Sequence, residues 1–380
     1  MRSSTRGEVD PFIVMDVMEA ARKLEDQGRR IIHMEVGQPG TPAPAPARAA
    51  LAQAMEQDAL GYTVALGLPE LRAGIAELYR DWYGVVLDPN RVVVTAGSSA
   101  AFVLAFTALF DAGAHVGVTE PGYPSYRQIL KSLDLVPVGL PTHAETRHVP
   151  ALPDKAMEGL IVASPANPTG TMLSREDLAA LIAQCDAAGT AFISDEIYHG
   201  VQYGAPAVSA LEVSDEVYVI NSFSKYFSMT GWRLGWMVVP QDHVRWIERL
   251  AQNMFICAPH AAQVAALGAL SARVETEAML EVYATNRALM LEGLHAAGFD
   301  KIAPPDGAFY VYADVSDWTQ DALGFCREVL EEAGVAITPG LDFDPVRGHQ
   351  TVRFSYARGT EDIVEGLARL QRFMSGRARL

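Results

Sequence analysis

Short apolar runs alternate with helical patterns between about residues 90 and 240, and this alternation constrains the fold more than any other feature. The runs are RVVVT at 91–95, HVGVT at 115–119, VPVGL at 136–140, LIVAS at 160–164, AFIS at 191–194, VYVINSF at 217–223 and LGWMVV at 234–239. Strands that are apolar along their whole length are typical of a parallel sheet buried on both faces. We therefore predict an α/β fold, with a mainly parallel sheet and helices on both faces.

The pattern changes after residue 275, which suggests a second domain. A long amphipathic helix over 276–297 is followed by AFYVYADV, VAIT and TVRFSYA and by a final helix from Thr360. This succession predicts a small α+β domain over 276–380, behind a large domain over 46–275. The segment 1–45 is expected to pack with the small domain.

Two local signals in the N-terminal segment predict its structure. Asp10 followed by Pro11 is typical of a helix start, and Gly28 is typical of a helix end, so we expect a helix between them. The prolines of TPAPAPA, from Thr41, favour a stiff extended connector.

Composition and charge exclude several functions. The 380 residues carry a formal net charge of −16, which argues against nucleic acid or an anionic membrane as the main partner. The three cysteines, Cys185, Cys257 and Cys326, are far apart, and no residues show metal-ligand spacing, so we expect neither disulfides nor a metal site. The polar N-terminus and the lack of an apolar run of roughly 18–20 residues predict a cytoplasmic globular protein, which we expect to be an enzyme.

Lys225 is the most informative of the five lysines. It lies among hydroxyl and aromatic residues in NSFSKYFSMTGWRLGW, just after a predicted strand, whereas the other lysines have polar neighbours. Loss of water around a lysine lowers its pKa and makes the amine nucleophilic, as Schiff-base chemistry requires. From this feature alone, a structural lysine and a catalytic lysine are equally good interpretations.

Polar residues follow several other strands at the edge where α/β sheets bind ligands. Asp195 and Tyr198 lie in ISDEIYHG, Asn167 lies in SPANPTG, and Arg233 follows Lys225 by eight residues. Gly97-Ser98-Ser99 stands between a strand and a helix, where a helix N-terminus suits a phosphate. Each signal alone is more typical of a turn or a cap, but together they supply an amine, a carboxylate, hydrogen-bond donors and an anion site.

With these motifs the sequence resembles the class I/II aminotransferases, which are fold-type I pyridoxal-phosphate enzymes of the aspartate and aromatic aminotransferase kind. The resemblance covers nearly the whole chain, through MEVGQPG, GYTVALGLPELR, TAGSSAAF, EPGYPSY, SPANPTG, SDEIYHG, SFSKYFSMTGWRLGW and TVRFSYA. The block from Ser222 to Gly235 is the most specific of these motifs.

The resemblance implies roles for residues around the cofactor ring. Lys225 would hold pyridoxal phosphate as a Schiff base and move protons during the reaction. Asp195 would pair with the pyridine nitrogen and keep it protonated. Tyr198 and Asn167 would donate to the ring 3′-oxygen, and Tyr123 would stack on the ring.

The same resemblance implies a phosphate site at the start of the helix after residue 97. Backbone N–H groups near Ser98 and Ser99 would bind the phosphate, with side-chain contacts from Ser222 and Arg233. Ser224 is a weaker candidate.

Further residues are implied at the substrate and at a subunit interface. Arg353 would bind the substrate α-carboxylate, assisted by the backbone N–H of Gly37 and the side chain of Asn167. Tyr62 would reach the phosphate of a neighbouring subunit, so the resemblance implies a homodimer.

The implied reaction is ping-pong transfer of the amino group of an L-amino acid to a 2-oxo acid. Aspartate, alanine, aromatic and branched amino acids all remain open as donors. The apolar segment Phe12-Ile13-Val14 favours an apolar or aromatic side chain, and serine at position 99, where some relatives carry lysine, weakly disfavours a dicarboxylate.

Two alternatives use the same cofactor. A carbon–sulfur β-lyase would share Lys225 and Asp195 and differ in leaving-group access, which the sequence does not reveal. A non-catalytic regulatory module that binds the cofactor is disfavoured by the net charge of −16 and by the short segment before the first predicted helix.

Overall fold

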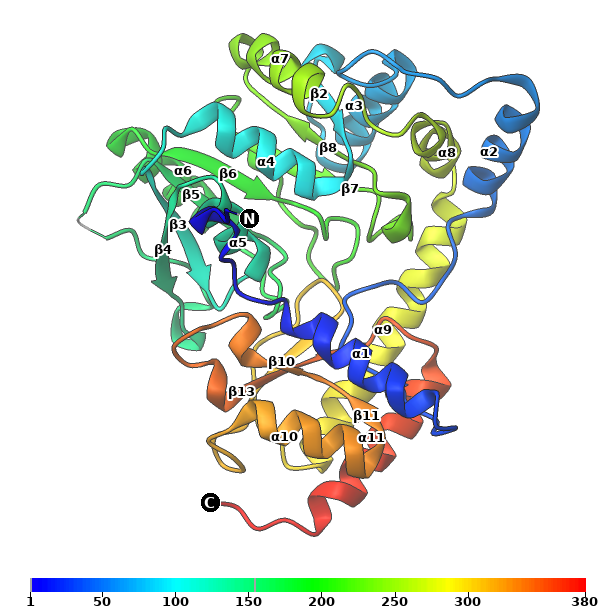
Figure 1. Cartoon of the computed structure of the whole chain (residues 1–380), viewed down its shortest axis with the longest axis vertical. Helices are drawn as coiled ribbons and strands as arrows, with labels where there is room; N and C mark the ends of the chain where they lie inside the picture. The colour runs from blue at the N-terminus through cyan, green and yellow to red at the C-terminus, as the bar shows by residue number, and fades with distance from the viewer. Residues whose placement is uncertain (1, 154) are drawn as a thin grey trace.

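The computed structural model describes residues 2–153 and 155–380. A seven-stranded sheet forms its upper part in Figure 1. In spatial order the strands are β2 (Val92–Thr95), β8 (Gly235–Val238), β7 (Tyr218–Ser222), β6 (Ala191–Asp195), β5 (Gly159–Ala163), β3 (His115–Glu120) and β4 (Val136–Pro141). Neighbours from β7 to β4 pair in parallel, and β8 is antiparallel to both β7 and β2. The predicted mainly parallel sheet is confirmed.

Helices cover both faces of this sheet, which explains why its strands are apolar throughout. Val93 and Ile193 face one helical layer, while their chain neighbours Val94 and Phe192 face the other. The first layer contains α4 (Gly97–Leu109), α5 (Pro124–Ser132) and α7 (Val244–Met254). The second contains α3 (Pro69–Tyr83), α6 (Arg175–Ala188) and α8 (His260–Leu270), and α2 (Ala45–Gln57) packs on α8.

A smaller sheet lies in the lower part of Figure 1, and its strands follow the long helix α9 (Arg273–Ala296) in the sequence. Its strand order is β12 (Thr338–Pro339), β13 (Thr351–Ser355), β10 (Tyr310–Asp314) and β9 (Lys301–Ile302). Helices α10 (Ala322–Glu328) and α11 (Thr360–Ser375) accompany it. The N-terminal segment joins this part, because β1 (Ile32–His33) pairs in parallel with β11 (Val335–Ala336). The division of the chain at residues 45 and 275 stays a prediction, and α9 runs unbroken through position 275.

The first helix begins later than predicted. Helix α1 (Ile13–Glu25) starts three residues after Asp10, and the backbone N–H groups of Ile13 and Val14 donate to the distant Asp342 carboxylate at 2.9 and 3.1 Å. Asp10 instead binds Lys131 and Gln128 on α5. A cap supplied from a position 329 residues away leaves no local signal in the sequence.

The proline run is only partly extended, which corrects the second local prediction. Helix α2 begins at Ala45, so Pro46 lies in its first turn. A proline there loses no hydrogen bond, because the first N–H groups of a helix have no partner within it.

Candidate active site

Lys225 lies at the carboxyl edge of the large sheet, three residues after β7. Its Nζ donates to the backbone oxygen of Gly37 at 2.6 Å. The loss of water around the ammonium, followed by the nearby Arg353 and Arg233 guanidinium groups, lowers the pKa of Lys225 to about 7. A large fraction of this lysine is therefore an uncharged, nucleophilic amine at neutral pH.

Asp195 ends β6 on the same edge and is fully buried. The hydroxyl of Tyr126 and the N–H of Ile197 donate to its two oxygens, the latter at 3.0 Å. Burial raises the pKa of Asp195 to about 6, although these two donors partly oppose the shift. Such a carboxylate is stabilised further by any cation placed against it. Tyr126 on α5 was missed at the sequence level, where it resembles an ordinary core tyrosine.

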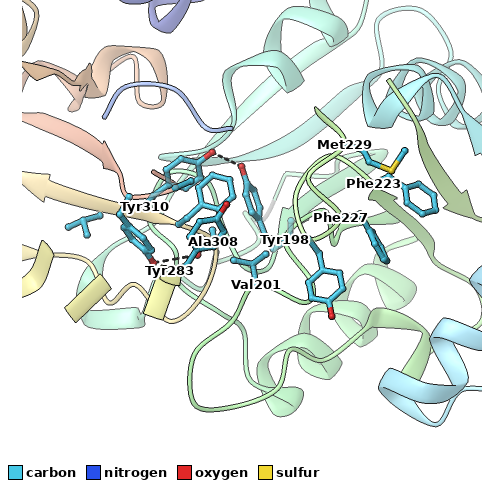
Figure 2. Packing of buried hydrophobic residues seen from close by; sticks show 14 of the residues in the cluster. Tyr198, Val201, Phe223, Phe227, Met229, Tyr283, Ala308 and Tyr310 are labelled. Carbon is cyan, nitrogen blue, oxygen red and sulfur yellow. Dashed lines mark hydrogen bonds between the residues drawn. The ribbon is translucent and has the colours of Figure 1, made fainter. Parts of the chain in front are cut away.

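Tyr198 and Tyr310 belong to one cluster of buried side chains (Figure 2), and Lys225 lies next to this cluster. The Nζ of Lys225 lies 5.5 Å from the ring centre of Tyr198 and 5.8 Å from that of Phe309. The hydroxyl of Tyr198 lies 2.6 Å from the hydroxyl of Tyr310, which no sequence motif singled out. Tyr123 meets Phe12 edge-on, with ring centres 6.1 Å apart.

Arg353 lies on β13 and is buried. Its Nη1 donates to Asn167 Oδ1 at 2.8 Å and its Nη2 to the backbone oxygen of Glu35 at 2.5 Å. Its Nε has no hydrogen-bond partner among the described residues. A buried unpaired donor on a guanidinium points to an anionic ligand, because such a donor costs free energy when it stays unpaired.

A second group of residues that suits an anion lies where α4 begins. Gly97 has a φ of +76°, and a Cβ there would lie 2.4 Å from the guanidinium of Arg233, so only glycine fits. A Cβ on Gly235 would likewise lie 2.9 Å from the backbone nitrogen of Ser98. The hydroxyls of Ser222 and Ser224 lie 2.8 Å apart beside this turn.

Two predicted site residues lie apart from this cluster in the single chain. Tyr62 is 82% exposed, and Ser99 is also exposed, one residue beyond the Gly97-Ser98 turn. The other predicted groups, Lys225, Asp195, Tyr198, Asn167, Arg233 and Arg353, come from both parts of the molecule.

A lysine of lowered pKa, a buried carboxylate and the guanidinium groups of two arginines thus belong to one candidate active site. The chain belongs to the family "Aminotransferase class I and II", whose model matches residues 29–370. The protein is therefore an aminotransferase, which transfers an amino group to a 2-oxo acid.

Three relatives illustrate this membership. A valine–pyruvate aminotransferase of Mycobacterium tuberculosis is 48% identical, with 97% of each chain covered. A crystal structure of a protein from Silicibacter pomeroyi is 64% identical with a TM-score of 0.95, and the match covers 99% of this chain and 100% of that one. The Thermus thermophilus aspartate aminotransferase, solved with maleate, is 32% identical with a TM-score of 0.91, covering 98% of this chain and 100% of that one.

Proposed function

We propose that this aminotransferase binds pyridoxal 5′-phosphate on Lys225 and works by a ping-pong mechanism. The observation that carries the proposal is the burial of Lys225 near Arg353 and Arg233, which lowers its pKa, because a covalent bond to the cofactor needs an uncharged amine. Two groups of residues suit the two anionic groups of the reactants. Gly97 and Arg233 suit a phosphate, and Arg353 suits a carboxylate. The donor set thus fits this cofactor together with an amino acid.

When bound, the cofactor supplies an electron sink for negative charge at the substrate α-carbon. Asp195 would keep the ring nitrogen protonated through its buried carboxylate, which Tyr126 holds in place. Tyr198 and Asn167 would donate to the ring 3′-oxygen, and Tyr123 would cover a ring face. Of these residues only Asp195 carries charge, so it would set the ring's electron demand.

Lys225 would carry the proton. Its Nζ would remove the proton from the substrate α-carbon as a base and donate it in the next step as an acid. A pKa near neutrality suits both directions, since neither protonation state is strongly disfavoured at physiological pH.

The phosphate would bind the backbone N–H groups at Ser98 and Ser99, the side chains of Ser222 and Arg233, and more weakly Ser224. Tyr62 would complete this site from a second copy of the chain. We therefore propose a homodimer, and its support is that Tyr62 is 82% exposed in the single chain.

The substrate α-carboxylate would bind Arg353, the side chain of Asn167 and the N–H of Gly37. We propose an apolar donor such as valine, with pyruvate as acceptor. The relative from Mycobacterium tuberculosis bears this activity in its name, and Phe12 places an apolar ring against Tyr123 beside the site.

We also propose a cytoplasmic location, which the three free cysteines favour. Within the described residues no helix is both long and apolar enough to span a bilayer.

The test is a visible absorbance scan of the purified protein after single amino acids are added. We expect valine to abolish the cofactor band and pyruvate to restore it, while Lys225→Ala should lose at least about 1,000-fold in turnover. Restoration by a 2-oxo acid after a different donor would correct the substrate but keep the reaction.

Other outcomes would contradict the proposal. Release of ammonia and pyruvate from cysteine conjugates, without band loss on other amino acids, would favour the β-lyase. A band that no amino acid changes would favour the regulatory module, and a protein that binds no pyridoxal phosphate would overturn the assignment.

A further inference from the structure

Tyr310 contacts several groups of the site, although its sequence context AFYVY is that of an ordinary buried strand. It begins β10, its side chain is buried, and its hydroxyl meets that of Tyr198 (Figure 2). The guanidinium carbon of Arg353 lies 4.3 Å from the centre of its ring. A Cβ on Gly37 would lie 1.8 Å from Tyr310 Oη, so glycine at position 37 makes room for this hydroxyl.

The direction of the hydroxyl–hydroxyl bond follows from the protons available. Burial raises the pKa of Tyr198 well above its usual value and also raises the pKa of Tyr310, so both phenols stay protonated. Each hydroxyl has one proton to donate. If Tyr198 uses its one proton in a hydrogen bond to the cofactor's ring oxygen, Tyr310 would be the donor in the 2.6 Å bond between the two hydroxyls.

We propose that Tyr310 is a positioning residue, whose hydroxyl orients and strengthens Tyr198 as a donor while its ring supports the Arg353 guanidinium. The inference rests on the proposed function, which supplies the cofactor oxygen that Tyr198 binds. A hydrogen bond received by a hydroxyl strengthens the bond that the hydroxyl donates. A guanidinium over an aromatic face is held by the ring's negative charge distribution.

The placement of Tyr310 also connects the two parts of the molecule. Tyr198 follows β6 of the large sheet, whereas Tyr310 and Arg353 lie on the paired strands β10 and β13 of the small sheet. The bond from Tyr310 to Tyr198 therefore joins the side of the site that would bind the cofactor to the side that would bind the carboxylate.

The competing explanation is that Tyr310 only fills space. Phe309 fills space next to it, meeting Tyr198 edge-on at 5.5 Å without a hydroxyl. Tyr312 provides a matched control on the same strand: it is buried, and its hydroxyl lies 2.6 Å from that of Thr351 rather than from Tyr198. Tyr310→Phe and Tyr312→Phe each remove one buried hydroxyl hydrogen bond of equal length.

The experiment compares the wild type with Tyr310→Phe, Tyr310→Leu and Tyr312→Phe as full-length protein. Three quantities are measured: the apparent pKa of the visible cofactor band, the dissociation constant of pyridoxal phosphate for the cofactor-free protein, and KM and kcat for the best donor. Thermal melting of the cofactor-free proteins reports the structural cost of each substitution.

Tyr310→Phe should raise the apparent pKa of the band by about 0.5 unit, because a weaker donor to the ring oxygen stabilises its negative charge less. It should weaken pyridoxal phosphate binding about fivefold and leave KM within about threefold of the wild type, because the ring under Arg353 remains. Tyr310→Leu should also raise KM by about fivefold. Tyr312→Phe should leave the band pKa, the pyridoxal phosphate affinity and KM unchanged and should affect only thermal melting.

A Tyr310→Phe protein whose band pKa and cofactor affinity match those of Tyr312→Phe would overturn the inference, because Tyr310 would then only fill space. Equal KM values for the Leu and Phe variants would overturn the role of the ring. A wild type that binds no pyridoxal phosphate would instead contradict the proposed function, so the two failures are distinguishable.

Discussion

At the scale of single residues, the chemistry depends on charges that the fold places around Lys225. Burial makes the largest contribution to its lowered pKa, and Arg353 and Arg233 follow, while Asp195 opposes them. Arg353 is 128 positions away in the sequence, so the chain can supply this cation only after the small sheet has packed against the large one. The charge state of the lysine therefore depends on where the fold places this arginine.

This dependence predicts how the cofactor-free protein reacts with pyridoxal phosphate at different pH values. The uncharged amine is the nucleophile, so the rate should rise with pH and level off above about 7, well below the ordinary lysine value of 10.5. Arg353→Gln should shift this inflection to higher pH because one nearby cation is lost.

The measurement is the rate of growth of the visible band after mixing, across a pH series. Arg347→Gln serves as the control, because Arg347 bonds Asp344 and the backbone oxygen of Thr142 rather than residues around Lys225. An inflection near 10.5 in the wild type, or an equal shift in both variants, would contradict the prediction.

At the scale of elements, the N-terminal segment links the two parts of the molecule beside the site. Asp342 caps α1 from the small part, whereas Asp10 and Phe12 contact α5 and Tyr123 of the large part. The start of α1 thus fixes where the Phe12 ring lies.

Asp342→Ala should therefore lower the free energy of unfolding by about 1–2 kcal/mol and raise KM for an apolar donor several-fold. The loss of stability follows from the lost cap of α1, and the rise in KM follows because Phe12 is no longer held in place. Thermal melting and donor kinetics test the two effects separately.

Asp321→Ala is the matched control, because Asp321 caps a different helix, α10, through the N–H of Gly324 at 2.9 Å. We expect this variant to lose stability without a change in KM. Equal KM values in the two variants would show that the α1 cap only stabilises the fold.

At the scale of the whole molecule, exposed apolar side chains gather around Tyr62. The segment 61–64 lies against 257–260, through a bond from His260 to the backbone oxygen of Gly61 at 2.9 Å and a contact of Thr63 with Cys257. Val64 is 59% exposed and the adjoining Ile256 is 49% exposed. Such a patch is typical of an interaction surface, and it agrees with the proposed dimer.

The dimer proposal predicts a sedimenting species of twice the 41.1 kDa chain mass. Ile256→Asp should shift it toward the monomer and weaken pyridoxal phosphate binding, because Tyr62 would no longer reach its partner's phosphate. Tyr62→Phe should weaken cofactor binding about fivefold while the protein stays dimeric. A wild-type monomer with full cofactor affinity would contradict both expectations.

Local sequence patterns were sufficient to predict the large sheet and the strand ends at which the candidate site lies. Apolar strand runs and polar residues just after them are local features, and they correctly predicted the mainly parallel sheet and placed Asp195 and Lys225 at its edge. The recognition of the family rested on the same local motifs.

Contacts between residues far apart in the chain became visible only in the folded structure. The cap of α1 by Asp342, the donor from Tyr126 to Asp195 and the bond from Tyr310 to Tyr198 each join positions 69 or more residues apart. A buried tyrosine or aspartate has the same local pattern whether it packs, caps or supports a site. Its role depends on the distance and burial that appear only when separate elements come together.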